Sequence, residues 1–292
     1  MPNFVGCMYY LLLLLLYPIA LLPFPVLYLL SDIVYIIIYR IAGYRKKVVY
    51  DNLKQAFPEK TDSEIRLIMK RFYHNFCDQW FEMIKLLTIS KEALNKRMKG
   101  DWEILQELDK QEINTYLLSG HTFNWEWANV AFQHNIPQQF IGVYMPVKNK
   151  GVERLITKLR TSGGGWMISM KAKKGFQRLQ QVRHATGLIA DQNPSNLNSA
   201  IWLPFMHREA PFFRGPELLA RRDNAAVVFV GIKKIKRGYY RIKFQTLTKN
   251  AAEMQSGGIM RLYVQFMEEQ LRKQPENWLW THKRWKHSKG IS

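Results

Sequence analysis

The chain has 292 residues, of which 47% are hydrophobic and 13% aromatic, enough for a sizeable core, so an intrinsically disordered chain is excluded. Lys and Arg number 43 against 23 Asp and Glu, and the net charge of +20 favours an anionic partner: nucleic acid, an anionic membrane surface or an acidic carrier protein. The only two cysteines, Cys7 and Cys77, exclude a disulfide framework and a CxxC metal pattern, as is typical of a reducing compartment.

Residues 1–31 carry no charged side chain. Their densest apolar part, MYYLLLLLLYPIALLPFPVLYLL, reaches the roughly 20 apolar residues that a helix needs to cross a bilayer. A cleaved signal peptide is the alternative, but it needs a basic start, a shorter apolar core and a small-residue cleavage site. We therefore expect an uncleaved membrane anchor over residues 1–45, with three prolines that can kink the helix: Pro18, Pro23 and Pro25.

The apolar pattern continues through residues 31–39, SDIVYIIIY, which are too few for a second full span, so we expect an interfacial or tilted segment there. Four basic residues follow at once, and the positive-inside rule then predicts a single-pass anchor with the body of the protein in the cytoplasm. These residues are Arg40, Arg45, Lys46 and Lys47.

Three further Lys/Arg runs lie at 171–184, 233–243 and 282–289. On a tethered domain, each basic residue near an anionic leaflet contributes about 1 kcal/mol to binding. The chain has neither a zinc-finger spacing nor an RNP-type aromatic motif, so we expect a membrane partner and no nucleic acid.

A capping box of Thr61 and Glu64 predicts the start of a core-facing helix, because apolar residues then recur at helical spacing as far as Leu87. Beyond Gly100, short apolar runs alternate with helical patterns, which predicts an α/β fold with a largely parallel central sheet flanked by helices, in one domain over 46–292. The expected strands are 115–119, 140–145, 187–191, 225–232 and 239–247, the last at the far side of the sheet, and the expected helices are 125–134, 150–160, 174–183, 215–222 and 257–273.

A histidine precedes a glutamate by five residues directly after the first of these strands, in LLSGHTFNWEWANVAF (117–132). Residues five apart lie about 140° from each other around a helix. His121 and Glu126 therefore meet only if His121 lies in the loop and Glu126 near the start of the next helix. Ser119 and Gly120 supply the break, and one of two polar residues can cap the helix: Thr122 or Asn124.

A histidine held by a carboxylate is typical of a general base, because the carboxylate fixes the ring tautomer and stabilises the imidazolium. The loop lies at the carboxyl edge of the sheet, where ligands bind. No GxSxG or other nucleophile is evident nearby, so an activated hydroxyl would belong to the substrate. A metal site would need HExxH or CxxC, and neither occurs. A purely structural histidine remains an alternative.

Four features follow one another along the chain: an apolar N-terminus leading into RKKVVYDNLKQAFPE (45–59), HTFNWE (121–126), DQNP (191–194) and PENWLWTHKRWK (275–286). In this order they resemble the late acyltransferases of lipid A biosynthesis (the lauroyl/myristoyl transferases), within the wider His-x4-Asp/Glu acyltransferases. The last stretch is the most specific, and together the four cover almost the whole chain.

This resemblance implies that His121 is the base and Glu126 its acidic partner. It also implies an arginine after YMPVKN (144–149) that holds an oxyanion or a phosphate; Arg160 matches best and Arg154 less well. Asp191 and Gln192 match an Asp-Gln motif of the family. Its two residues either contact substrate or support the loop structurally, and we favour structural support. Asn124 and Arg214 are further candidates for substrate binding. Three tryptophans are expected to pack rather than to act in catalysis: Trp278, Trp280 and Trp285.

The implied activity is direct acyl transfer, without an acyl-enzyme, from acyl carrier protein to a hydroxyl of an anionic lipid A precursor at the bacterial inner membrane. Neither a metal nor an organic cofactor is required. The chain has Phe212 and Phe213 where the family often has a threonine before Gly-Pro, which leaves another lipid acceptor open, such as a lysophospholipid or an aminolipid. A membrane-anchored basic binding protein is the non-enzymatic alternative.

Overall fold

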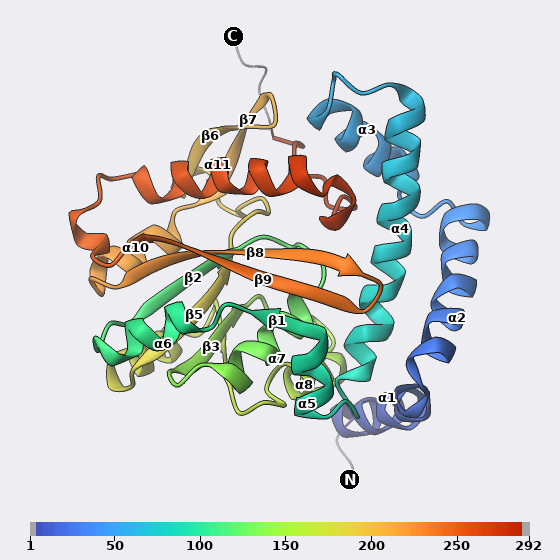
Figure 1. Cartoon of the computed structure of the whole chain (residues 1–292), viewed down its shortest axis with the longest axis horizontal. Helices are drawn as coiled ribbons and strands as arrows, with labels where there is room; N and C mark the ends of the chain where they lie inside the picture. The colour runs from blue at the N-terminus through green and yellow to red at the C-terminus, as the bar shows by residue number, and fades with distance from the viewer. Residues whose placement is uncertain (1–3, 288–292) are drawn as a thin grey trace.

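The computed structural model describes residues 4–287 and contains a central seven-stranded sheet in the order β1-β9-β8-β2-β5-β3-β4 (Figure 1). Every strand pair is parallel except β8 with β9, which is antiparallel. The prediction of a largely parallel α/β sheet is therefore confirmed. The strands of this sheet are β1 (Met98–Gly100), β2 (Thr115–Ser119), β3 (Gln139–Tyr144), β4 (Trp166–Ser169), β5 (His184–Ile189), β8 (Ala226–Lys236) and β9 (Tyr239–Thr248).

Helices cover both faces of the sheet, and alternate residues of one strand belong to different cores. In β2, Tyr116 and Leu118 join a core with α11, whereas Leu117 joins a second core with α7. Figure 1 shows α11 on one side of the sheet and α5 to α8 on the other. The helices are α3 (Lys46–Ala56), α4 (Asp62–Lys85), α5 (Lys91–Arg97), α6 (Glu103–Lys110), α7 (Trp125–Asn135), α8 (Lys150–Arg160), α9 (Lys173–Gln177), α10 (Gly215–Arg222) and α11 (Gly258–Lys273).

Most of the predicted elements are present with shifted ends. The Thr61–Glu64 capping box starts α4 as expected. The strand expected at 187–191 lies earlier, at His184–Ile189, and the helix expected over 174–183 is α9 followed by a 3-10 turn. The strand expected at the far side of the sheet, β9, lies one place in from the edge because the three-residue β1 pairs with it. Strands β6 (Ala200–Phe205) and β7 (Arg208–Phe213) form a separate antiparallel pair.

The apolar N-terminus is helical as expected, and one of its three prolines divides it into two helices. The chain forms α1 (Phe4–Leu21) and α2 (Phe24–Tyr35), and a π-helical turn, η1 (Ile36–Ile41), continues α2. The break falls at Pro23, whose extended backbone (ψ 153°) and missing N–H end the first helix and start the second. Within residues 4–287, the helical stretch long and apolar enough to cross a membrane is Phe24–Ile41; α1 contributes a shorter apolar helix.

Candidate active site

The loop between β2 and α7 carries the predicted site residues, at the carboxyl edge of the parallel strands. Figure 1 shows that edge turned toward α4. Asn124 caps α7: its side-chain oxygen accepts a hydrogen bond from the Trp127 N–H at 3.0 Å. His121 precedes the cap in the loop, and Glu126 follows in the first turn of the helix. The local structure expected from the sequence is therefore present.

The carboxylate that binds His121 is that of Asp191. Its Oδ1 lies 2.6 Å from His121 Nδ1, and its Oδ2 accepts the His121 backbone N–H at 2.7 Å. The order of the strands explains why these residues are adjacent. Strands β2 and β5 are parallel neighbours with Ser119 opposite Ile189, so His121 and Asp191, each two residues further along, lie side by side at the end of the sheet. The indole N–H of Trp278 donates to the same carboxylate at 2.5 Å.

Asp191 has no exposed surface, and burial alone would raise its pKa. The charge of His121 and the hydrogen bonds from His121 and Trp278 outweigh burial and hold the pKa of Asp191 below its ordinary value. An ionised Asp191 accepts the Nδ1–H of His121, which leaves Nε2 as the acceptor of the neutral ring. Gln192 lies on that side, with its amide nitrogen 3.3 Å from Nε2.

Glu126 binds Arg160 instead of His121. The Arg160 Nε donates to Glu126 Oε2 at 2.8 Å and Nη2 donates to Oε1 at 2.6 Å, while the Trp125 indole donates to the same carboxylate at 2.9 Å. Burial would lower the pKa of Arg160, but the charge and hydrogen bonds of Glu126 raise it. The two carboxylates that the sequence singles out thus bind two different basic side chains, Asp191 that of His121 and Glu126 that of Arg160.

A cavity of about 370 Å³ connects these two pairs. Its polar end includes His121, Glu126, Arg160 and Gln192, and it continues between the sheet and α7 along an apolar wall. Exposed Met145 and Met170 are also part of the lining. The apolar wall consists of Leu117, Phe132, Phe140, Met167, Val230 and Ile232. This shape suits a hydrocarbon chain with its reactive end beside His121.

The remaining candidates occupy different places. Asn124 is fully buried, and its amide donates to Glu82 Oε2 at 2.7 Å, so both ends of its side chain contact protein. Arg214 is exposed and follows Phe213, a residue of the cavity lining. Arg154 stacks on the ring of Tyr9 at 4.3 Å, so it packs against α1.

The C-terminal tryptophans are buried as expected, but sequence reasoning missed the contact of Trp278 with Asp191. The placement of Trp278 follows from an isolated β-bridge between Trp278 and Thr122, which joins the C-terminal segment to the His121 loop. The sequence feature that could have predicted this contact is the presence of the HTFNWE, DQNP and PENWLW stretches in one chain. Over residues 4–287, no three His, Cys, Asp or Glu side chains are grouped as metal ligands would be.

Comparison with known proteins gives the same assignment as the motifs. The family model described as bacterial lipid A biosynthesis acyltransferase matches residues 3–287. The lipid A biosynthesis lauroyltransferase of Escherichia coli (strain K12) is 24% identical over 277 residues, which cover 91% of this chain and 87% of that protein. Since the family model spans nearly the whole chain, the protein is an enzyme that transfers acyl groups and belongs to the bacterial lipid A biosynthesis acyltransferases.

Proposed function

We propose that this enzyme moves a fatty acyl chain from acyl carrier protein directly to a hydroxyl of a lipid A precursor, with His121 as general base and no acyl-enzyme. The observation that carries the proposal is the pairing of His121 with buried Asp191 at the mouth of an apolar cavity. In this geometry Nε2, on the side of the ring away from Asp191, is the atom that takes a proton from a substrate hydroxyl.

The reaction begins when Nε2 removes the proton of the acceptor hydroxyl as its oxygen attacks the thioester carbonyl. Asp191 orients the ring and stabilises the imidazolium, as the acid of a catalytic triad does. A tetrahedral oxyanion forms, collapses and expels the thiolate of the donor, which receives the proton from His121. The ester is then complete, and His121 is neutral again.

Arg160 is the candidate for binding the oxyanion. Its contact with Glu126 uses two of its five N–H groups, so donors remain for the substrate. Glu126 thus fixes the position of the guanidinium rather than that of the histidine. One such donor commonly contributes about 3 to 4 kcal/mol to the transition state.

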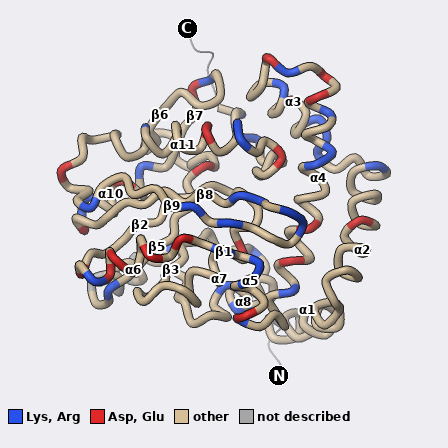
Figure 2. Tube along the Cα trace, viewed as in Figure 1, with Lys and Arg blue, Asp and Glu red and all other residues tan. Residues whose placement is uncertain are grey.

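The acidic carrier and the phosphorylated acceptor both suit a chain of net charge +20. Lys and Arg are concentrated at the β8–β9 hairpin near the edge of the sheet that carries the site (Figure 2). Exposed Arg214, beside the cavity lining, is the candidate for contact with an acceptor phosphate. We place the reaction at the cytoplasmic leaflet of the inner membrane, where both substrates would be present.

The test is transfer of a labelled acyl chain from acyl carrier protein, with a tetra-acylated lipid A precursor and a lysophospholipid offered side by side. His121→Ala should lower transfer to the precursor by about 10²- to 10⁴-fold, the range for loss of a general base. His207→Ala, at an exposed histidine, is the matched control and should retain full activity. Full activity of His121→Ala would refute the base, and product on the lysophospholipid alone would refute the acceptor.

A further inference from the structure

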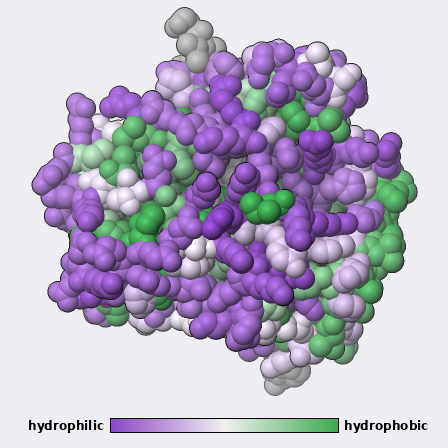
Figure 3. Space-filling model, viewed as in Figure 1, coloured by the Kyte–Doolittle hydropathy of each residue, from purple (hydrophilic) through white to green (hydrophobic). Residues whose placement is uncertain are grey.

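The outer surface of the N-terminal helices is apolar and uncovered. Figure 3 shows a hydrophobic edge where Figure 1 places α2, and Figure 2 shows no charged residue along α1. Such a patch marks an interaction site on a protein. Its exposed members are Tyr10, Leu11, Leu14, Leu15, Tyr17 and Leu21 on α1, Val26, Leu29 and Ile33 on α2, and Ile36, Ile37 and Ile41 on η1.

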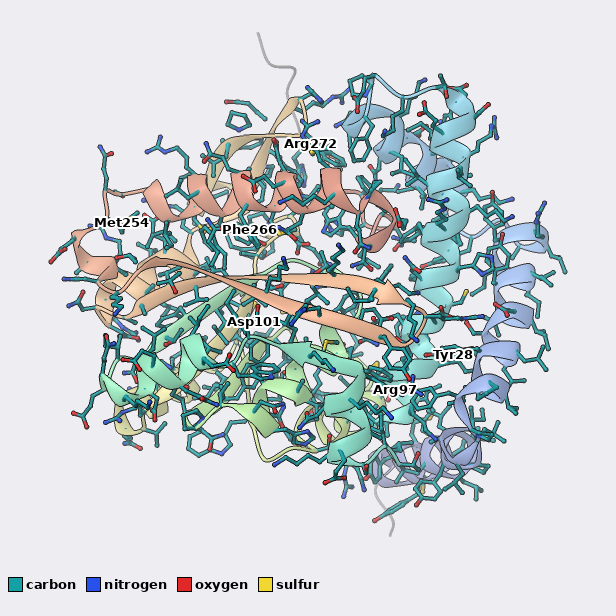
Figure 4. All side chains as sticks on the ribbon, viewed as in Figure 1. Tyr28, Arg97, Asp101, Met254, Phe266 and Arg272 are labelled. Carbon is teal, nitrogen blue, oxygen red and sulfur yellow. The ribbon has the colours of Figure 1, made fainter. Side chains whose placement is uncertain are left out.

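The inner surface of α2 is bound to the domain by polar contacts, chiefly with the buried carboxylates of α4. The Ser31 hydroxyl donates to Asp78 of α4 at 2.8 Å, and the Tyr28 hydroxyl donates to Glu82 of α4 at 2.9 Å. Arg237, in the β8–β9 turn, binds Asp32 of α2 and Asp78 at 2.7 Å each. Figure 4 shows Tyr28 on the side of α2 that faces α4.

The helix α1 is docked in the same way. Lys85 Nζ, on α4, donates to the carbonyl oxygens of Ala20 and Leu22 at 2.7 and 2.8 Å. At the other end of α1, a Cβ at Gly151 of α8 would lie 3.1 Å from the Tyr9 backbone nitrogen, so the two helices touch there without room for a side chain.

These contacts conflict with a crossing of the bilayer by α2. A spanning helix is surrounded by lipid over about 30 Å, but α2 lies lengthwise against α4, whose carboxylates Asp78 and Glu82 are 1% exposed. Detaching α2 would uncover both carboxylates, and keeping it docked would bring the charged β8–β9 hairpin into the hydrocarbon region. One uncovered apolar face on otherwise docked helices fits a position in the interface plane.

We propose that α1, α2 and η1 form a monotopic membrane-binding surface that enters one leaflet, in place of the single-pass anchor expected from the sequence. The partner is a leaflet of anionic lipids, because exposed Arg40 lies within η1 and exposed Lys47 lies just beyond it, next to the apolar face. The inference deepens the membrane attachment of the proposed function and is independent of its acyl-transfer chemistry.

This orientation gives the acceptor lipid a short route to the site. Besides α4, α1 packs against α8, which carries Arg160 at its far end. Exposed Met145 and Val147 precede α8, and Met145 lines the cavity. Apolar Met145 and Val147 thus lie between the α1 contact on α8 and the cavity, where an acyl chain could pass.

Depth measurement separates the two arrangements. Spin labels are attached at Leu14→Cys and at Ile33→Cys in a Cys7→Ser background, and the full-length protein is bound to vesicles of phosphatidylglycerol and phosphatidylethanolamine. Ile33 lies near the middle of Phe24–Ile41. A monotopic surface places both labels about 5–10 Å into the leaflet, whereas a spanning helix places the Ile33 label near the midplane, about 15 Å deep. A midplane depth at Ile33 would overturn the inference.

A vesicle-binding assay compares variants on this apolar face with a control variant elsewhere on the surface. Ile33→Asp together with Ile37→Asp should weaken binding at least tenfold, whereas Leu218→Asp, at an exposed leucine on α10, should leave it unchanged. Equal binding by all three proteins would contradict the inference. Transfer to detergent-dispersed acceptor, measured in parallel, reports on the proposed function alone and should persist in the double variant.

Discussion

At the scale of single residues, the site depends on which carboxylate binds His121 and which binds Arg160. Asp191→Asn keeps the shape of the side chain but allows it to bind the other tautomer of His121, which leaves no acceptor at Nε2. We expect kcat/KM to fall by about 10³- to 10⁴-fold, as in triads that lose their acid. Glu126→Gln, which leaves the His121–Asp191 contact intact, should cost less. Steady-state transfer assays check this, and a larger loss in Glu126→Gln would reverse the two roles.

The same residues show what spacing in a sequence can and cannot predict. The loop position of His121 and the capped start of α7 follow from local signals, and both were predicted. The pairing with Asp191 crosses 70 residues and depends on β2 lying beside β5. The alternation of strands and helices does not specify that order. The sequence therefore predicts the nearer carboxylate, Glu126, as the partner of His121, whereas the structure has Asp191.

A buried histidine outside the site gives a prediction for stability. Burial lowers the pKa of His184 to about 4, and its Nδ1 lies within hydrogen-bond distance of the Thr186 hydroxyl, at 2.9 Å. Between pH 6.5 and about 4 the unfolded chain binds a proton that the folded chain does not, so stability is full above pH 6.5 and falls as the pH drops toward 4. The whole loss from this group is about 3 kcal/mol.

His184→Gln should therefore show a smaller drop in melting temperature between pH 7 and pH 4.5 than the wild type. His207→Gln is the control, because His207 is exposed. Identical pH dependence in wild type and His184→Gln would show that His184 is not the group responsible.

At the scale of elements, helices with clear periodicity were predicted well: α8 and α10 span the predicted residues. Elements governed by other signals were missed. The β6–β7 hairpin turns through Met206 and His207, which have positive φ without being glycine, so no turn residue marks it. The α1–α2 break depends on which of several prolines ends a helix, and composition alone does not decide that.

The contact of α2 with the domain can be tested at Arg237. Arg237→Ala leaves Asp78 buried with Lys234 Nζ at 3.3 Å as its remaining cation, so we expect a loss of about 3 kcal/mol, the low end for breaking a buried pair. Arg241→Ala breaks an exposed pair with Asp101 and should cost at most about 1 kcal/mol. Thermal unfolding in detergent compares the two variants, and equal shifts would mean that the α2 contact adds nothing to stability.

At the scale of the whole molecule, the excess of positive charge should appear as salt dependence. If the net charge of +20 attracts an acidic carrier, raising salt from 0.05 to 0.5 M shortens the range of that attraction and slows encounter. We expect kcat/KM for acyl carrier protein to fall about tenfold or more. An acyl-pantetheine donor, which has the same thioester without the charge, should change little under the same conditions. Equal salt dependence for the two donors would place the effect on the anionic acceptor or the membrane surface, and the carrier would then be recognised by shape rather than by charge.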